Sequence, residues 1–453
     1  MGKRGSDVRS VKSVAEATPP AFPPARQTPL SARSSESAGP MATMMLIYLV
    51  VVVGRIGDIV PGMHSIPLAK IVALLAIILA ATNWSKLPAV SVWSLPPAKF
   101  TLLFMLLVTF SMVFSVLRHA TLGVITGTVL SVSVGMVLMI KSARNWPAIR
   151  RLLLGCVLSA LVLAASVEIT RRAGRAGSDM DLDPNDFAFV LVGLLPLVLA
   201  FASLSRGLKK ISFFVAALWV VFEILRTESR GGLLGLLCVV LLMMALAPMR
   251  RRGRIVLKAS KGTIVARILI LVMVGIVAWH AIPDSARTRL ATLEHPTNGY
   301  NTNLNDPTGR FSIWLQTLPL SLHRPWGWGA GAFVAVDGMY GGGKFKAPHN
   351  MYLQALIELG FLGFALFLAA MVSAYTRLKR EAFDRAEPAD QDAVERRVFA
   401  RTLIASLSGL CVSGFFLSEL YSQAVWAVII LACLVGRSAP RADAAPQPAI
   451  VRQ

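Results

Sequence analysis

Long apolar runs, interrupted by short polar segments, fill the chain from about residue 42 to about residue 437. A membrane-spanning helix needs about 20 mostly apolar residues. By this criterion we expect twelve transmembrane helices, at residues 42–60, 66–82, 98–117, 120–140, 150–167, 185–204, 211–226, 231–247, 264–281, 349–374, 401–417 and 421–437. The pattern therefore predicts an all-α integral membrane protein.

The two ends of the chain differ from this pattern. Residues 1–41 are rich in Pro, Ser, Ala and Arg and show no periodicity, which predicts a disordered cytoplasmic tail. Residues 438–453 are rich in Pro and Ala and are expected to form a second cytoplasmic tail. Between the tails we expect helices one to nine in residues 42–281, a periplasmic loop at 282–348 and helices ten to twelve in 349–437.

Composition excludes a water-soluble protein. Hydrophobic residues make up 55% of the chain and charged residues only 15%, whereas a soluble domain has about 25% charged residues. The formal net charge is +22, but the basic residues lie between apolar runs, where they would meet anionic lipid headgroups. We therefore expect membrane lipids, and no nucleic acid, as partners.

The distribution of Lys and Arg predicts the orientation. With both termini in the cytoplasm, the inner segments hold 32 Lys and Arg against 10 Asp and Glu, and the outer segments hold 13 against 12. Cytoplasmic loops carry the excess of basic residues. The densest inner clusters are expected at residues 248–263 and 375–400, and the charged residues Lys70, Glu223 and Glu358 fall within spans.

The outer segment 282–348 is long, at 67 residues, and long loops are usually functional. Asp306 and Pro307 have the residue types of a helix N-cap and first helical position. Apolar residues recur after them at helical spacing: Phe311, Trp314, Leu315, Leu318 and Leu322. This pattern predicts an amphipathic helix on the outer membrane face.

Arginines beside glycines give the first candidate chemistry. Arg226 and Arg230 are four residues apart, so one helical turn would place them on the same side, and Gly231 and Gly232 follow. The guanidinium fork and free amides at a helix start suit a phosphate group. Arg310 is expected near the start of the loop helix, where the helix dipole also favours an anion. The alternative is that these arginines contact lipid headgroups.

A histidine gives the second candidate. Pro348 fits the first position of the helix at 349–374, which would place His349 at the second. The positive end of the helix dipole favours a neutral imidazole, which is a competent general base; the alternative is a histidine that only caps the helix. No two of the six histidines have zinc-ligand spacing, so no metal site and no cofactor are expected.

Other outer residues are weaker candidates. Trp326 and Trp328 alternate with glycines and would serve as interface anchors or as a platform for a sugar, and His323 and Tyr352 lie close to these motifs. Asp183 and Pro184 are expected to be the N-cap and first residue of the helix that follows. Arg175, which precedes them, would contact these acids or a bound phosphate.

Together, the motifs resemble the O-antigen ligase and O-antigen polymerase superfamily. The resemblance rests on S-R-G-G at 229–232, G-R-F-S-I-W at 309–314, P-W-G-W-G-A-G at 325–331 and H-N-M-Y-L-Q-A-L-I-E-L-G at 349–360, and D-P-N-D-F-A at 183–188 also fits. It covers residues 42–437 and includes the large periplasmic loop ahead of the histidine helix.

The resemblance implies a metal-independent, inverting glycosyltransferase that is similar to the GT-C class, in the bacterial inner membrane with its active site facing the periplasm. Such a ligase moves a glycan from undecaprenyl pyrophosphate to lipid A–core. The resemblance makes His349 the general base and assigns Arg230 and Arg310 to the pyrophosphate, with Arg226 and Arg175 as helpers. His323, Trp326, Trp328 and Tyr352 are then candidates for the acceptor sugar or the loop.

Three alternatives stay open at this point. The nearest is an O-antigen or exopolysaccharide polymerase that uses the same lipid-linked donor. A protein O-oligosaccharyltransferase ranks lower, because such enzymes usually carry extra C-terminal periplasmic sequence. A transporter ranks lowest, since transporters tend to place ionisable groups at the bilayer midplane and to show internal repeats.

Overall fold

The computed structural model describes residues 39–59, 67–88, 90–169, 183–246, 249–251, 254–256, 309–341 and 345–436, and the single positions 262, 265 and 269. Helices occupy eleven of the twelve ranges predicted to span the membrane. The remaining range, 264–281, lies almost wholly outside the described residues, as do the predicted tails except for residues 39–41, which begin the first helix.

The first half of the described chain is a series of apolar helices. They are α1 (Gly39–Val52), α2 (Ile56–Ile59), α3 (Leu68–Thr82), α4 (Pro96–Phe110), α5 (Arg118–Val124), α6 (Leu130–Ser142), α7 (Trp146–Ile169), α8 (Pro184–Leu204), α9 (Gly207–Arg226) and α10 (Arg230–Leu246). Short 3-10 turns lie at Trp84–Lys86, Val92–Ser94 and Ser111–Val113, and one π-helical turn, η4 (Ile125–Val129), joins α5 to α6.

The second half contains three short helices and three long ones. The short helices are α13 (Arg310–Thr317), α14 (Leu320–His323) and α15 (Phe333–Tyr340), and the long ones are α16 (Met351–Ala382), α17 (Gln391–Gly414) and α18 (Gln423–Val435). A two-stranded antiparallel hairpin, β1 (Met249–Arg251) and β2 (Arg254–Val256), lies within the segment predicted to be cytoplasmic and was not expected.

Among the residues that the structure describes, five helical segments are long and apolar enough to cross a membrane: Pro96–Val113, Arg118–Ser142, Trp146–Ser166, Pro184–Leu204 and Met351–Ala382. Shorter apolar helices lie at Gly39–Val52, Leu68–Thr82, Arg230–Leu246 and Gln423–Val435. The described part of the chain is therefore a helical bundle of the kind found in integral membrane proteins, which confirms that part of the predicted fold class.

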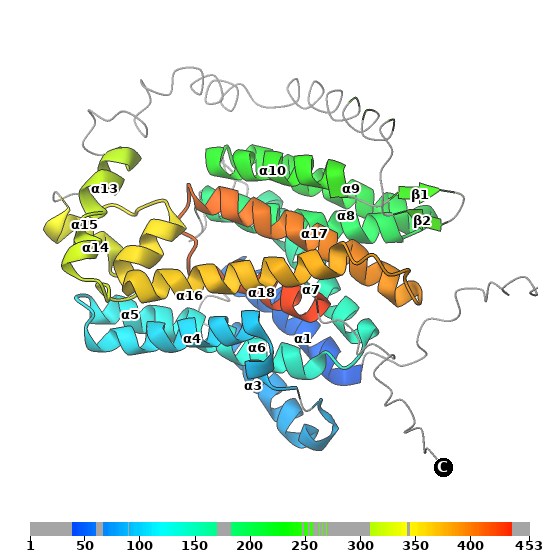
Figure 1. Ribbon diagram of the computed structural model, residues 1–453, viewed down its shortest axis with the longest axis horizontal. Coiled ribbons are helices and arrows are strands. Elements are labelled where there is room, and N and C mark those ends of the chain that lie inside the picture. Colours follow the sequence, from blue (N-terminus) through cyan, green and yellow to red (C-terminus); the bar gives the residue numbers. More distant parts are fainter. Residues whose placement is uncertain are drawn as a thin grey trace, which may run out of the picture.

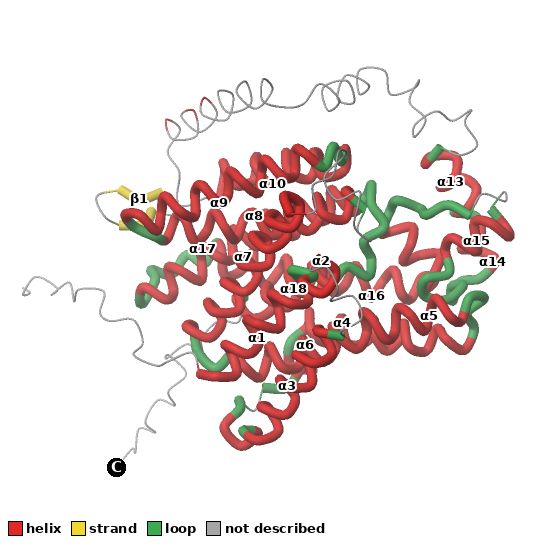
Figure 2. Tube along the Cα trace, turned by 180° about the vertical axis from the view of Figure 1, so that it is seen from behind, coloured by secondary structure: helices red, strands yellow, loops and turns green. Residues whose placement is uncertain are grey.

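The long helices lie roughly side by side, and α17 packs against α8, α10 and α16. The short helices α13, α14 and α15 gather at one end of the bundle, and the β1–β2 hairpin lies at the other (Figures 1 and 2). Close packing of α10 on α17 depends on Gly235 and Gly409, because a Cβ at either position would overlap Ser413 or Val239. Small residues at such contacts allow neighbouring membrane helices to approach closely.

Helix α16 is broken at Gly360, which has φ +67° and ψ −168°. The break leaves backbone amide and carbonyl groups of α16 without helical partners, and these groups form hydrogen bonds with the segment Pro325–Gly329. The amide of Trp328 donates to the carbonyl of Ile357 at 3.0 Å, and the amide of Phe361 donates to the carbonyl of Pro325 at 2.9 Å. Only glycine has the space and the backbone freedom that this position requires, since a Cβ on Gly360 would overlap the Pro325 carbonyl.

Candidate functional site

His349 precedes helix α16 and is not part of it. The prediction that Pro348 and His349 are the first two helical residues is wrong, because Asn350 is the N-cap. Its Oδ1 accepts hydrogen bonds from the amides of Tyr352 at 2.9 Å and Leu353 at 3.0 Å. His349 itself has a left-handed backbone conformation, with φ +45°. It therefore lies just outside the N-terminal end of the helix, where the positive end of the helix dipole favours a neutral ring.

The surroundings of His349 keep its imidazole neutral. Burial and the positive charges of Arg310 and Lys346 together lower the pKa of His349 to about 4, although the negative charge of Asp183 opposes them. The backbone amide of His349 donates to Ser418 Oγ at 2.8 Å. Near neutral pH the ring is thus unprotonated and able to accept a proton.

Arg310 is the first residue of α13, and Gly309 is its N-cap. The predicted N-cap at Asp306 is therefore wrong for this helix, and residues 306 and 307 lie outside the described part of the chain. Arg310 Nη1 donates to the carbonyl of Phe416 at 3.0 Å, whereas its buried Nε has no hydrogen-bond partner among the described residues. Burial lowers the pKa of Arg310, as does the charge of Arg230, and the charge of Asp183 opposes both.

Arg226 and Arg230 belong to different helices. Arg226 ends α9 and Arg230 begins α10, with a turn between them in which Glu228 has φ +53°. The prediction that one helical turn aligns the two arginines is therefore wrong. Arg226 forms an ion pair with Glu223 at 3.2 Å within its own helix, and Arg230 lies close enough to Arg310 for its charge to lower the pKa of that residue.

The connector between α17 and α18 contacts both Arg310 and His349. This role for the connector was not predicted from the sequence. The Phe416 carbonyl binds Arg310, and Ser418 Oγ binds the amide of His349. A Cβ on Gly231, next to Arg230, would lie 3.0 Å from the Phe416 side chain. A run of polar residues between two apolar helices, S-E-L-Y-S-Q at 418–423, was the available signal.

Asp183 is the N-cap of α8, as predicted. Its carboxylate accepts from the Asn185 amide at 3.0 Å, and Pro184 follows at the first helical position. The structure also gives Asp183 an electrostatic part in the site, because its charge acts on both Arg310 and His349. Arg175 lies outside the described residues.

The candidates for the acceptor sugar or the loop have no contact with Arg310 or His349 that the structure describes. The exposed His323 ring is 3.1 Å from the Pro319 carbonyl, at the end of α14. Trp326 is exposed, whereas Trp328 is buried in a small core with α13 and α15. The Trp328 ring stacks on Arg324 at 4.2 Å and contacts Tyr340. Tyr352 Oη donates to the Cys411 carbonyl at 3.0 Å.

Glu358 is a buried carboxylate that holds the glycine–tryptophan segment in place. It accepts hydrogen bonds from the Gly331 amide at 2.7 Å, from Tyr421 Oη at 2.6 Å and from the Phe333 amide at 3.3 Å. Tyr421 belongs to the α17–α18 connector, so this carboxylate links α16, the connector and the segment before α15. These hydrogen bonds explain why a carboxylate, Glu358, lies within a segment predicted to span the membrane.

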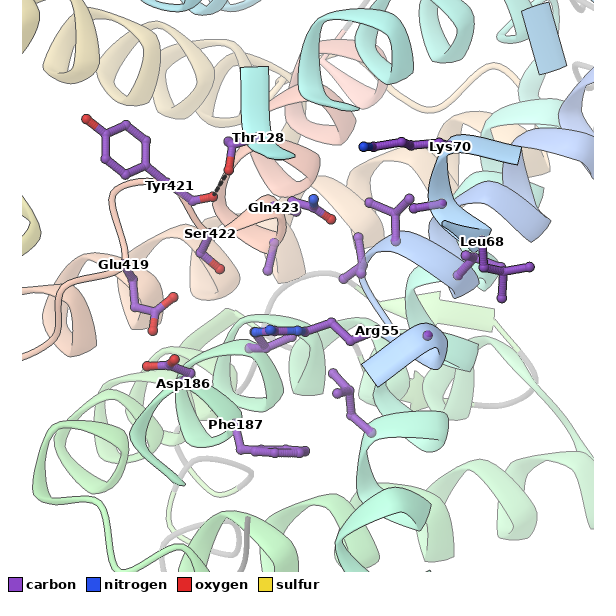
Figure 3. A pocket seen from close by; sticks show the side chains of 18 of the residues that line it. Arg55, Leu68, Lys70, Thr128, Asp186, Phe187, Glu419, Tyr421, Ser422 and Gln423 are labelled. Atoms are coloured by element: carbon purple, nitrogen blue, oxygen red, sulfur yellow. Dashed lines mark hydrogen bonds between the residues drawn. The ribbon is translucent and has the colours of Figure 1, made fainter. Parts of the chain in front are cut away.

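A cavity of about 500 Å³ adjoins the connector (Figure 3). It lies between α1, the starts of α3 and α8, and the start of α18, and its charged lining residues are Arg55, Lys70, Asp186 and Glu419. Among the residues that the structure describes, no group of three or more His, Cys, Asp or Glu residues could hold a metal ion.

Residues 213–368 match the family model described as O-antigen ligase. This match confirms the superfamily that the motifs predict, and it spans Arg230, Arg310 and His349. No curated protein matches the chain. The apolar helices indicate a multi-pass membrane protein, and the matched region is similar to a family of glycosyltransferase-like enzymes, ligases or polymerases, whose substrates are lipid-linked glycans.

Proposed function

We propose that this protein is an O-antigen ligase, which transfers O-antigen glycan from undecaprenyl pyrophosphate to lipid A–core. One observation carries the proposal: Arg230, Arg310 and a neutral His349 meet at one end of a helical membrane bundle. Two cations suit a pyrophosphate, and an adjacent neutral imidazole suits the deprotonation of a hydroxyl group. Within the family that the chain matches, this pairing fits transfer from a lipid pyrophosphate to a sugar.

Arg230 and Arg310 are proposed to hold the pyrophosphate. The charge on its oxygens increases as the glycosidic bond breaks, and positioned cations stabilise that charge. Arg310 offers a buried Nε with no partner among the described residues, beside an Nη1 already directed by the Phe416 carbonyl. A guanidinium held at one edge in this way presents a fixed donor to an incoming phosphate oxygen.

The two remaining arginines have smaller proposed parts. Arg226 is engaged with Glu223, so it would support the end of α9 and add its charge at longer range. Arg175 stays a candidate for the pyrophosphate from outside the described residues.

His349 is proposed to be the general base. Its unprotonated ring nitrogen takes the proton of the acceptor hydroxyl as the oxygen attacks the anomeric carbon. The bond between that carbon and the pyrophosphate oxygen breaks, and its electron pair leaves with undecaprenyl pyrophosphate. Attack opposite the leaving group inverts the configuration. A positioned base of this kind contributes about 10²–10⁴-fold in rate.

The site is proposed to face the periplasm, with both termini in the cytoplasm and twelve helices in the inner membrane. The site lies at the end of the bundle where α8, α10 and α16 begin. The basic segments at β1–β2 and at the end of α16 lie at the opposite end (Figure 1). That separation of charge fits the positive-inside rule.

The test is transfer by purified protein supplied with undecaprenyl-pyrophosphate-linked glycan and lipopolysaccharide that lacks O-chain. The expected product is lipopolysaccharide that carries the glycan, formed equally well in EDTA. Elongation of the lipid-linked glycan, without transfer to lipopolysaccharide, would show a polymerase. In a deletion strain, a ligase leaves core without O-chain, and a polymerase leaves core with a single repeat.

A further inference from the structure

The cavity beside the connector has the lining of a sugar site. Its walls combine apolar side chains, including Val52, Leu68 and Phe187, with the polar groups of Thr128, Ser422 and Gln423. Mixed walls of this kind bind ligands that have both hydroxyl groups and an apolar ring face. Its volume of about 500 Å³ lies within the range of about 300–1,000 Å³ that is typical of small-molecule sites.

Two carboxyl groups face each other on one side of the cavity (Figure 3). Asp186 comes from the first turn of α8 and Glu419 from the connector. Burial, the hydrogen bond to Asp186 and the charge of Asp186 raise the pKa of Glu419 well above its usual range, although the hydrogen bond to Ser422 and the charge of Arg55 oppose them. A pair that shares one proton offers both a donor and acceptors to sugar hydroxyls.

Two cations complete the lining. Arg55 lies beside the carboxyl pair, and Lys70 extends along the opposite side from the first turn of α3 (Figure 3). Lys70 is exposed, and neither carboxyl group is paired with it by any hydrogen bond or ion pair that the structure describes. A lysine in such a place suits an anionic substituent such as phosphate.

The cavity is linked to the proposed catalytic site through neighbouring residues on two elements. Ser418 binds the backbone of His349, and the next residue, Glu419, lines the cavity. On the other side, Asp183 acts electrostatically on His349 and Arg310, and Asp186, one helical turn later, lines the cavity. A sugar in the cavity would therefore contact the same two elements, the connector and the start of α8, that act on the base.

We propose that this cavity binds the acceptor: a sugar with an anionic substituent, whose hydroxyl groups contact the Asp186–Glu419 pair and whose phosphate or carboxylate contacts Lys70. The inference rests on the proposed transferase function and adds the place and charge of the acceptor. Arg55 orients the carboxyl pair and adds positive charge. The donor pyrophosphate is assigned to Arg230 and Arg310, which do not line the cavity.

Gly57 gives a steric test. It lines the cavity from α2, and a Cβ there would meet no atom within 4 Å. The start of a side chain at this position is therefore unobstructed, and Gly57→Trp is designed to place its ring in the cavity. We expect it to weaken binding of lipopolysaccharide that lacks O-chain by tenfold or more, about 1.4 kcal/mol, and to leave donor binding unchanged. The matched control is Gly123→Trp, at an exposed helical glycine that is equally unobstructed and lies away from the cavity.

Lys70 gives a test of charge. Lys70→Gln should weaken binding of the same lipopolysaccharide about tenfold. Against lipopolysaccharide whose phosphates have been removed enzymatically, the variant and the wild type should bind alike, because the contact is already lost. If the wild type binds dephosphorylated lipopolysaccharide less tightly, the anion is a phosphate. If the wild type binds it as tightly as before, and Lys70→Gln still binds it weakly, the anion is a carboxylate. The control is Lys99→Gln, at an exposed lysine in the first turn of α4.

Binding is measured directly with full-length protein in detergent, and transfer is measured separately. The inference is overturned if Gly57→Trp and Lys70→Gln bind acceptor as the wild type does, or if they lose donor binding as well, since the cavity would then serve the donor. Absence of transfer by the wild type, with both substrates present, overturns the proposed function instead. Because Lys70→Gln removes only an exposed charge, it tests the inference even if Gly57→Trp fails to fold.

Discussion

Ser418 accepts a hydrogen bond, 2.8 Å long, from the backbone amide of His349. The bond crosses 69 residues of sequence and fixes the backbone at the one position that carries the proposed base. His349 has the left-handed φ of +45°, which a non-glycine residue adopts at some cost. The bond from its own amide to Ser418 and the cap at the next residue, Asn350, fix the backbone that carries the imidazole, within reach of the charge of Arg310.

Replacement of His349 should separate chemistry from binding. We expect His349→Ala to lower the rate of transfer about 10²–10⁴-fold and to leave donor affinity within about twofold, because donor binding is assigned to the arginines. Transfer is measured from initial rates, and donor affinity is measured by equilibrium binding.

His323→Ala is the matched control for this experiment. His323 is exposed and its ring lies against the Pro319 carbonyl of its own helix, so the variant should keep substantial activity. Transfer by His349→Ala at nearly the wild-type rate, or loss of donor binding together with transfer, would exclude the general-base role.

The pH dependence of transfer should report on His349. The pKa of the ring is lowered to about 4 in the free protein, by burial first, then by Arg310 and Lys346, with Asp183 in opposition. The base must be neutral, so activity is lost as the pH falls through this pKa. A bound pyrophosphate would offset the charges of Arg310 and Arg230, and should therefore raise the pKa of His349 in the donor complex.

The measurement compares two profiles between about pH 4 and about pH 8. The acidic limb of kcat/KM for the donor, which reports the free protein, should lie lower than the limb of kcat/KM for the acceptor at saturating donor. Coincident limbs would mean that the donor phosphates do not act on His349. The midpoint of thermal unfolding at each pH identifies any loss that arises from acid denaturation.

The identity of the arginine should matter at positions 230 and 310. Lysine keeps the charge but lacks the planar fork, so Arg310→Lys should weaken donor binding about tenfold or more. Arg310→Ala and Arg230→Ala should bind the donor still less well, with normal amounts of protein in the membrane.

Arg118 supplies the control, because it also begins a helix, α5, and is exposed. Arg118→Lys and Arg118→Ala should bind donor as the wild type does. If the alanine variants at 230 and 310 also behave as the wild type, those arginines contact lipid headgroups and not the substrate.

Glu358→Gln should destabilise the fold. The carboxylate accepts from Gly331, Phe333, Gln354 and Tyr421, and an amide would turn one of its oxygens into a donor that faces other donors. Each buried donor left unpaired costs about 1–3 kcal/mol. We expect a lower midpoint of thermal unfolding in detergent and earlier proteolysis near Arg324. Glu387→Gln, at an exposed position, should leave both unchanged.

The orientation can be tested with single cysteines after removal of the four native ones. Leu322 lies exposed on α14, in the segment proposed to be periplasmic, and Ile255 lies in β2, in the segment proposed to be cytoplasmic. We expect an impermeant maleimide to label Leu322→Cys in intact cells, and Ile255→Cys only after permeabilisation. The reverse pattern would overturn the orientation and with it the location of the site.

The membrane helices were predictable because each depends on a continuous apolar run, which is a local property of the sequence. The Asp183–Pro184 start of α8 was predictable for the same reason. The start of α16 was not, since Pro348 and Asn350 are both good starting signals and only the fold decides between them. The turn between Arg226 and Arg230 was expected from the gap between two apolar runs, but its backbone conformation was not, since Glu228 has φ +53° and the two arginines end up on different helices.

The assembly of the site was less predictable than its members. His349 and Arg310 were found from their motifs, but the connector that positions them was not. Phe416 binds Arg310 across 106 residues of sequence, and Ser418 binds His349 across 69. Neither contact produces a periodic pattern that could be recognised in the sequence. The cavity was missed for the same reason, because Lys70, Asp186 and Glu419 come from three separate parts of the chain.

The break in α16 has a consequence for the recombination of related sequences. Because Gly360 and the segment Pro325–Gly329 occupy each other's space, neither can be exchanged alone. A chimera with a crossover between them would set a foreign segment against a break of different shape. Residues 325–361 should therefore be inherited as one block, and engineers who exchange the loop between homologous enzymes need to carry the first part of α16 with it.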